Sequence, residues 1–211
     1  MRQKKFLVTG ALLLALCLTG TINLACDLLF PVEEVKYEIP SYYTTYTDES
    51  QLFSISYPNY WQRPMGEVAS FQEYTKKSAT TLKSGLPLEH ASLLFFAGLD
   101  NVRRYDPLIV VAVEPVTSGV FTQKQAVEAE LRRIILDEPG YKVLSRVDTK
   151  IDGRQATVLI WNEPDLGNLH IVEMLMLVDQ SVWLVAGVTA DATSKWDVDF
   201  NTIVRSLQIY E

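Results

Sequence analysis

The fold is decided by the stretch Phe53-Ser54-Ile55-Ser56-Tyr57-Pro58-Asn59-Tyr60-Trp61. Its first five residues alternate apolar and polar side chains, which is the period-two pattern of a half-buried strand. The proline that follows lacks an N–H donor and ends the strand. The aromatic residues at this end provide a large apolar surface that packs under a following element. We expect delivery segments before this region and one folded domain, residues 43–211, around and after it.

Length and charge limit the classes of protein that the chain can belong to. Its 211 residues suit a single domain with a sizeable core, and its formal net charge is -7. The first 25 residues hold three basic and no acidic residues, so the remainder has 16 basic against 26 acidic residues, a net charge of -10. Such an acidic surface repels phosphate backbones and anionic headgroups, which disfavours nucleic-acid binding and electrostatic adsorption to membranes.

The first 25 residues have the three-part layout of a bacterial export signal. Three basic residues precede an apolar run from Phe6 to Leu18, and small and polar residues follow it. The run is short for a membrane-spanning helix. We therefore expect residues 1–25 to be a signal peptide. The alternative is an uncleaved anchor in which residues 6–25 span the membrane.

The sequence Ile22-Asn23-Leu24-Ala25-Cys26 resembles a lipobox, in which a cysteine is linked to diacylglycerol and becomes the new N-terminus. No thiol follows Cys26, which argues against an intramolecular disulfide. We expect Cys26 to be lipidated and residues 26–42, which contain two prolines and an acidic pair, to form a lipidated tether. The protein is then exported and held at the outer face of the cytoplasmic membrane. The alternative is an incidental cysteine beside an ordinary cleavage site.

Periodicity and turn residues indicate the elements of the domain. A hairpin is expected at 43–47 and 53–57, a helix at 67–83, and two adjacent central strands at 91–99 and 107–116. Thr122 and Gln125 form a capping box at the start of a helix over 122–137, with Val127 and Leu131 on its apolar face and Glu130 outward or flanking.

A four-strand meander is expected to follow this helix, at 141–148, 155–161, 170–178 and 182–190, with Asp152-Gly153 as its first turn. Thr193 or Ser194 caps a final helix whose apolar positions are Trp196, Phe200, Ile203 and Leu207. This order predicts an α+β fold with helices against a mainly antiparallel sheet.

Several of these segments resemble the PsbP family: the stretch at 53–61, the helix at 122–137, the Asp-Gly hairpin, and the closing pattern Phe200-x-x-Ile203-Val204-x-Ser206-Leu207. The likeness runs from about residue 44 to 211. It implies an α/β/α sandwich with a central, mainly antiparallel sheet. It also implies relatives that are extrinsic photosystem II subunits, bacterial lipoproteins of unknown role, or binders of a small GTPase. No functional residue of the family carries over to a position in this chain.

The sequence offers few groups for chemistry. Its only imidazoles are His90 and His170, and His170 faces the opposite side of its strand from Glu173. Glu163 and Asp165, with Asn168, could hold Ca²⁺ weakly, although a solvated hairpin loop is the favoured interpretation. The sequence has no nucleophile elbow, no phosphate-binding Gly-rich loop and no thiol in the domain. We therefore expect no metal and no cofactor.

An aromatic-rich segment, Tyr37, Tyr42, Tyr43 and Tyr46, suggests a protein partner at the membrane. The alternative is that these residues cover the sheet edge or pack on the domain's own core. The sequence favours a membrane-tethered, extracytoplasmic, non-catalytic binding or assembly module. One alternative is a hydrolase-type enzyme whose site is assembled from Glu163, Asp165 and His170. Another is a weak carrier of a metal or ligand.

Overall fold

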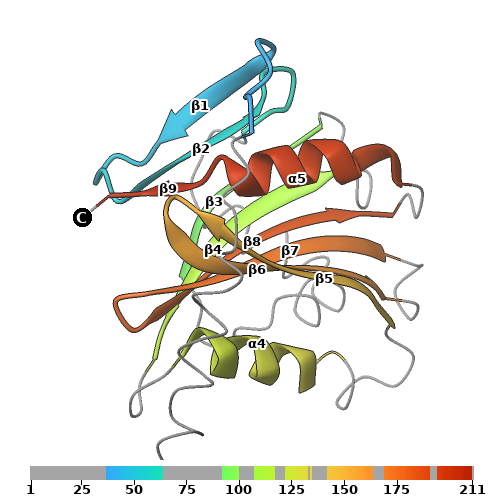
Figure 1. Ribbon diagram of the computed structural model, residues 1–211. Coiled ribbons are helices and arrows are strands. Elements are labelled where there is room, and N and C mark those ends of the chain that lie inside the picture. The colour runs from blue at the N-terminus through green and yellow to red at the C-terminus, as the bar shows by residue number, and fades with distance from the viewer. Residues whose placement is uncertain are drawn as a thin grey trace, which may run out of the picture. The chain divides into compact units, whose positions relative to one another are not determined.

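The computed structural model describes residues 37–63, 92–99, 107–116, 122–132, 134, 142–163, 169–190 and 194–210. A six-stranded, wholly antiparallel sheet runs through them in the order β3-β4-β8-β7-β6-β5 (Figure 1). Its strands are β3 (Ser92–Gly98), β4 (Leu108–Pro115), β5 (Lys142–Ile151), β6 (Arg154–Glu163), β7 (Leu169–Val178) and β8 (Ser181–Thr189).

The predicted meander is confirmed as strands β5 to β8. Two-residue turns join its first and last pairs, and all four turn residues have positive φ: Asp152 (52°), Gly153 (72°), Asp179 (48°) and Gln180 (59°). Such turns match the right-handed twist of the strands that they connect. The last strand, β8, then pairs antiparallel with β4, which joins the meander to the earlier part of the chain.

The two strands expected at 91–99 and 107–116 are adjacent, as predicted, but only β4 is central. Among the described residues, β3 is the end strand of the sheet, and its first residues are partly exposed. A register shift between Leu93 and Phe95 interrupts its pairing with β4. A central strand and an edge strand that is covered by other parts of the domain can both have apolar runs. The run alone therefore does not distinguish them, and the expectation that β3 is central was wrong.

The sheet separates two hydrophobic cores, because successive side chains of a strand point to opposite faces. Helix α4 (Gln123–Arg132) packs Val127 on one face, beside Trp161 and Leu175. Helix α5 (Asp197–Arg205) packs Phe200 and Ile203 on the other face. The strands thus lie between helices, as Figure 1 shows, and the expected α+β sandwich with a central antiparallel sheet is confirmed.

The capping box of α4 is present. Thr122 N–H donates to Gln125 Oε1 at 3.0 Å, and Gln125 N–H donates to Thr122 Oγ1 at 3.3 Å. Glu130, expected to be outward or flanking, is buried. It lies three residues after Val127, and residues at this spacing share one face of a helix.

The start of the final helix differs from expectation. A 3₁₀ turn, η2 (Ser194–Trp196), precedes α5, the N-cap position is Trp196, and no side chain caps the helix. Thr193 lies outside the described residues. Trp196 is the last residue of this 3₁₀ turn, and the centroid of its ring lies 6.1 Å from the centroid of the Trp61 ring. Further along the helix, the Phe200 ring lies so close to Gly187 of β8 that a Cβ at position 187 would overlap it, so glycine is required at this contact.

The predicted hairpin is confirmed as β1 (Tyr43–Thr47) and β2 (Phe53–Pro58), but it belongs to a separate sheet. A two-residue strand that the sequence did not reveal, β9 (Gln208–Ile209), pairs with the other side of β2. Strand β2 is buried along its whole length rather than on one face. The Ser206 hydroxyl extends this pairing, because its oxygen accepts from Ser56 N–H at 2.8 Å and lies 3.1 Å from Ser56 O.

The expected signal peptide at 1–25, Cys26 and the helix expected at 67–83 lie outside the described residues. Within the part of the chain that the structure describes, no helix has the length and apolar character needed to cross a membrane.

Candidate functional site

The structure gives His170 partners other than those considered from the sequence. Asp165, Asn168 and His90 lie outside the described residues. Glu163 is the last residue of β6, and its backbone pairs with Leu169. Of the candidate set Glu163, Asp165 and His170, only the His170 side chain has a described environment.

His170 joins three elements. Its Nδ1 lies 2.8 Å from Asn162 Oδ1 on β6, and its Nε2 lies 2.6 Å from Asp197 Oδ1 at the start of α5. The side chain is only 5% exposed. Glu173 faces the other side of the sheet, as predicted, where its Oε2 accepts a hydrogen bond from Trp161 Nε1 at 3.2 Å. This imidazole thus fastens α5 to the sheet and offers little surface to a substrate.

Within the described ranges, no group of three His, Cys, Asp or Glu side chains is placed to hold a metal ion. Asp165 and Asn168 lie outside those ranges, so the weak Ca²⁺ site stays a prediction.

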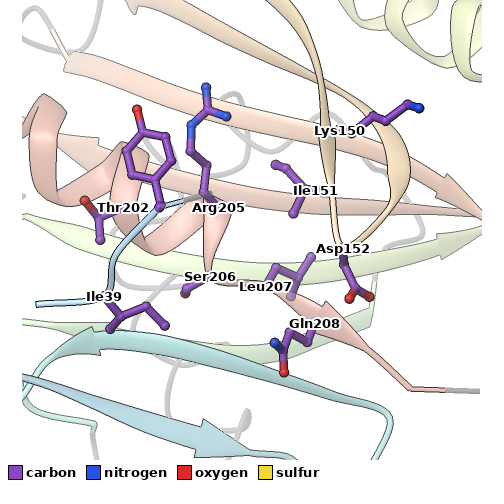
Figure 2. A pocket seen from close by; sticks show the side chains of 10 residues that line it. Ile39, Lys150, Ile151, Asp152, Thr202, Arg205, Ser206, Leu207 and Gln208 are labelled. Carbon is purple, nitrogen blue, oxygen red and sulfur yellow. The ribbon is translucent and has the colours of Figure 1, made fainter. Parts of the chain in front are cut away.

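A pocket of about 290 Å³ lies beside the C-terminal end of α5 (Figure 2). We call it the Arg205 pocket. Three segments enclose it: the entry segment (residues 37–42), the turn between β5 and β6, and the chain from α5 into β9. Its lining residues are Tyr37, Ile39, Lys150, Ile151, Asp152, Thr202, Arg205, Ser206, Leu207 and Gln208.

Arg205 is the central polar group of this pocket. Its guanidinium carbon lies 4.7 Å from the centre of the Tyr37 ring, and its Nη1 donates to Thr149 Oγ1 at 3.3 Å. Its Nε is buried and has no hydrogen-bond partner among the described residues. Asp152, on the opposite side, accepts hydrogen bonds from Arg154 and from Ile209 N–H, so its charge is already compensated.

The four tyrosines of the aromatic segment divide into two kinds. Tyr43 and Tyr46 pack on the domain itself: Tyr43 donates to Asp199 Oδ1 at 2.7 Å, and the Tyr46 ring stacks on Phe95 at 4.9 Å. Burial, with a further contribution from the hydrogen bond to Asp199, raises the pKa of Tyr43. Tyr37 and Tyr42, by contrast, are 44% and 46% exposed. Tyr43 and Tyr46 therefore pack on the domain's own core, whereas a protein partner for this segment stays a prediction.

The outer edge of β1 carries backbone groups that have no partner within the described part of the chain. Asn59 N–H donates to Tyr42 O and Asp48 N–H donates to Phe53 O, so residues 42, 44, 46 and 48 direct their backbone groups toward β2. Thr45 and Thr47 direct theirs outward, where no described residue pairs with them. Tyr60, half exposed, lies with Tyr42 at one end of this edge.

No family model matches the sequence, and no curated protein matches it. Solved structures do match. Cyanobacterial PsbP (CyanoP) from Synechocystis aligns over 86% of this chain and all of its own, with a TM-score of 0.50 and 12% identity. The chain has a PsbP-like fold.

A protein of unknown function from Pseudomonas aeruginosa aligns with the PsbP-like chain over 81% of its length and 99% of the Pseudomonas protein, with a TM-score of 0.51 and 14% identity. The Ran-binding protein Mog1p from Saccharomyces cerevisiae covers 79% of this chain and 95% of itself, with a TM-score of 0.47 and 10% identity. At identities of 12% and 14%, the likenesses to the Synechocystis and Pseudomonas proteins show the PsbP-like fold alone.

Sequence reasoning missed two features of this PsbP-like domain. The Arg205 pocket needs residues from three distant segments, and no local pattern connects them. The open edge of β1 carried a partial signal: the strand Tyr43-Thr44-Thr45-Tyr46-Thr47 has high β-propensity and neither charge nor proline, but its sequence does not say which side β2 occupies.

Proposed function

We propose that this chain is a membrane-tethered, extracytoplasmic PsbP-like lipoprotein that acts as a non-catalytic binding or assembly module. Its N-terminal sequence supports the location, because an export signal precedes Cys26 in a lipobox-like context. The diacylglycerol on Cys26 is the anchor, and the protein works at the outer face of the cytoplasmic membrane. The net charge of -10 on the remainder of the chain supports a protein partner rather than a nucleic acid.

The outer edge of β1 is the observation that carries this proposal. Natural edge strands are usually protected by lysine, proline, a bulge or a covering segment. Strand β1 contains neither lysine nor proline, its pairing with β2 is regular, and Thr45 and Thr47 direct their backbone groups away from β2. An extended segment of a partner protein would add a strand here, with main-chain hydrogen bonds supplying affinity. Exposed Tyr42 and Tyr60 would add contact area at one end.

Two substitutions at Thr45 test this edge. Thr45→Pro removes the outward N–H and blocks strand addition, while an edge position facing away from the neighbouring strand tolerates proline. Thr45→Val is the matched control, because it also loses the hydroxyl that lies 2.8 Å from Ser56 Oγ but keeps the N–H. Each full-length variant is used as bait on solubilised membranes, and its melting is followed by circular dichroism.

We expect Thr45→Val to retain the proteins that the wild type captures and Thr45→Pro to lose them, with both variants melting cooperatively. Equal capture by a folded Thr45→Pro variant would show that strand addition at β1 is not the binding mode.

The burial of His170 supports a non-catalytic module over the hydrolase-type alternative. A general acid or base must come within hydrogen-bond reach of its substrate. Both ring nitrogens of His170 already lie within hydrogen-bond distance of Asn162 or Asp197, and the side chain is buried between α5 and the sheet.

A further inference from the structure

We propose that the Arg205 pocket binds a small organic carboxylate. This ligand site goes beyond the partner-binding edge of β1, because it lies on other segments and needs no protein partner. The assignment rests on the hydrogen-bonding groups of the lining, on its charge and on its apolar walls.

Most polar side chains of the pocket already have intramolecular partners. Thr202 Oγ1 donates to Val198 O at 2.7 Å, and Ser206 Oγ donates to Ile203 O at 2.7 Å. The carboxylate of Asp152 accepts two hydrogen bonds, from Arg154 and from Ile209 N–H. These groups shape the pocket. Both hydroxyl donors are used, and the hydrogen-bonding capacity that the three groups have left is acceptor capacity, which does not bind an anion.

Arg205 is different, because its supply of donors exceeds what the protein uses. A guanidinium has five N–H donors and no acceptor. Its only hydrogen bond among the described residues is the one from Nη1 to Thr149, and no described carboxylate forms an ion pair with it. The Tyr37 ring covers a face of the Arg205 guanidinium, so the edge of the guanidinium is the part left for a ligand. A planar carboxylate accepts two parallel hydrogen bonds from such an edge.

Local charge also favours an anion. Although the domain is acidic, the cations Arg205 and Lys150 line this pocket with a single carboxylate, Asp152, which Arg154 compensates. In Figure 2 Lys150 extends away from Arg205, so it contributes a longer-range potential while Arg205 makes the direct contact.

The remaining lining residues indicate what the part of the ligand beyond its carboxylate must be. Ile39, Ile151 and Leu207 are aliphatic, and Tyr37 adds an aromatic ring. The volume of about 290 Å³ lies at the lower end of the range of about 300–1,000 Å³ for ligand pockets. A small acid with a compact apolar body therefore fits better than a large or purely polar anion.

Benzoate is the probe, with benzamide as its neutral isostere and inorganic phosphate as a non-planar anion. Binding to the purified full-length chain is measured by calorimetry and by the rise in melting temperature that a native-state ligand produces. Arg205→Gln removes the cation. Arg63→Gln is the matched control, because Arg63 also stacks on a tyrosine, 4.1 Å from the centre of the Tyr46 ring, but does not line the pocket. Ile39→Trp fills the pocket at a half-exposed position.

We expect benzoate to bind the wild type, Arg63→Gln and Thr45→Pro alike. Arg205→Gln should weaken binding at least about tenfold, as expected for loss of a charge-assisted hydrogen bond, and Ile39→Trp should abolish it while remaining folded. Equal binding of benzamide, or preference for phosphate, would overturn the carboxylate assignment. Absence of benzoate binding, or unchanged binding by Arg205→Gln and Ile39→Trp, would overturn the site. None of these outcomes depends on whether β1 recruits a partner.

Discussion

Tyr43 shows how one residue ties the small sheet to the last helix. Its ring lies at the start of β1, and its hydroxyl donates to Asp199 of α5, 156 residues away in the chain. Desolvation by burial is the largest cause of its raised pKa, followed by the hydrogen bond to Asp199. Burial also raises the pKa of Tyr46, Tyr57 and Tyr60. The folded domain therefore favours neutral phenols around this sheet.

This preference predicts how stability depends on pH. An unfolded tyrosine titrates near pH 10, so the contribution of Tyr43 is fully present below about pH 10 and is lost as pH rises toward its higher folded pKa. Tyr43→Phe should lower the free energy of unfolding at pH 7 by about 1 kcal/mol, because it removes one hydrogen bond. Above about pH 10 the free energy of unfolding should fall less steeply with pH for the Tyr43→Phe variant than for the wild type. The two slopes should differ by up to about 1.4 kcal/mol per pH unit.

Urea unfolding of both proteins at neutral pH and at steps through the alkaline range provides the measurement. Parallel alkaline slopes would show that Tyr43 ionises equally in the folded and unfolded chains. The three other tyrosines with raised pKa values remain in both proteins, so the comparison isolates Tyr43.

At the scale of the element, α4 depends on its buried face. Val127 is 1% exposed, whereas Leu131, on the face expected from the sequence to be apolar, is only partly buried. Gln123 anchors the first turn of the helix, since its amide donates to Leu175 O at 2.9 Å and accepts from Leu177 N–H at 2.8 Å on β7. The side of α4 nearest β7 is therefore the side that fixes the helix.

We predict that Val127→Asp unfolds the domain and that Leu131→Asp only weakens it. Burying an unpaired carboxylate at position 127 costs several kcal/mol out of a total stability of about 5–15 kcal/mol, while the carboxylate at position 131 reaches water. Thermal melts by circular dichroism distinguish the two variants. A cooperatively folded Val127→Asp protein would contradict the observed packing of this helix.

At the scale of the whole molecule, the proposed location depends on Cys26. If this residue is the lipidated N-terminus, Cys26→Ala should accumulate as an uncleaved precursor and lose diacylglycerol labelling. Metabolic labelling with a fatty acid, combined with mass spectrometry of the mature N-terminus, tests this. Recovery of mature, unmodified Cys26 from the culture medium would exclude the anchor without affecting the fold or the Arg205 pocket.

The sequence by itself determined the features that depend on neighbouring residues. Alternating side chains predicted the strands of the meander, and Asp152-Gly153 predicted its first turn because both residues accept positive φ. Thr122 and Gln125 marked the start of α4, since each satisfies an N–H of the first turn. The order of these elements predicted an α+β fold, and the resemblance of several segments to the PsbP family implied the sandwich arrangement.

Only the tertiary structure decided which distant faces meet. Strand β9 is too short for any periodic pattern and exists because β2 pairs with it. Ser54 and Ser56 alternate like outward residues, yet they are buried because the C-terminal segment covers them. His170 meets Asp197, and Arg205 meets Tyr37, across long stretches of chain. Backbone period and turn geometry are local properties, whereas these contacts depend on how complete elements pack, which no short segment encodes.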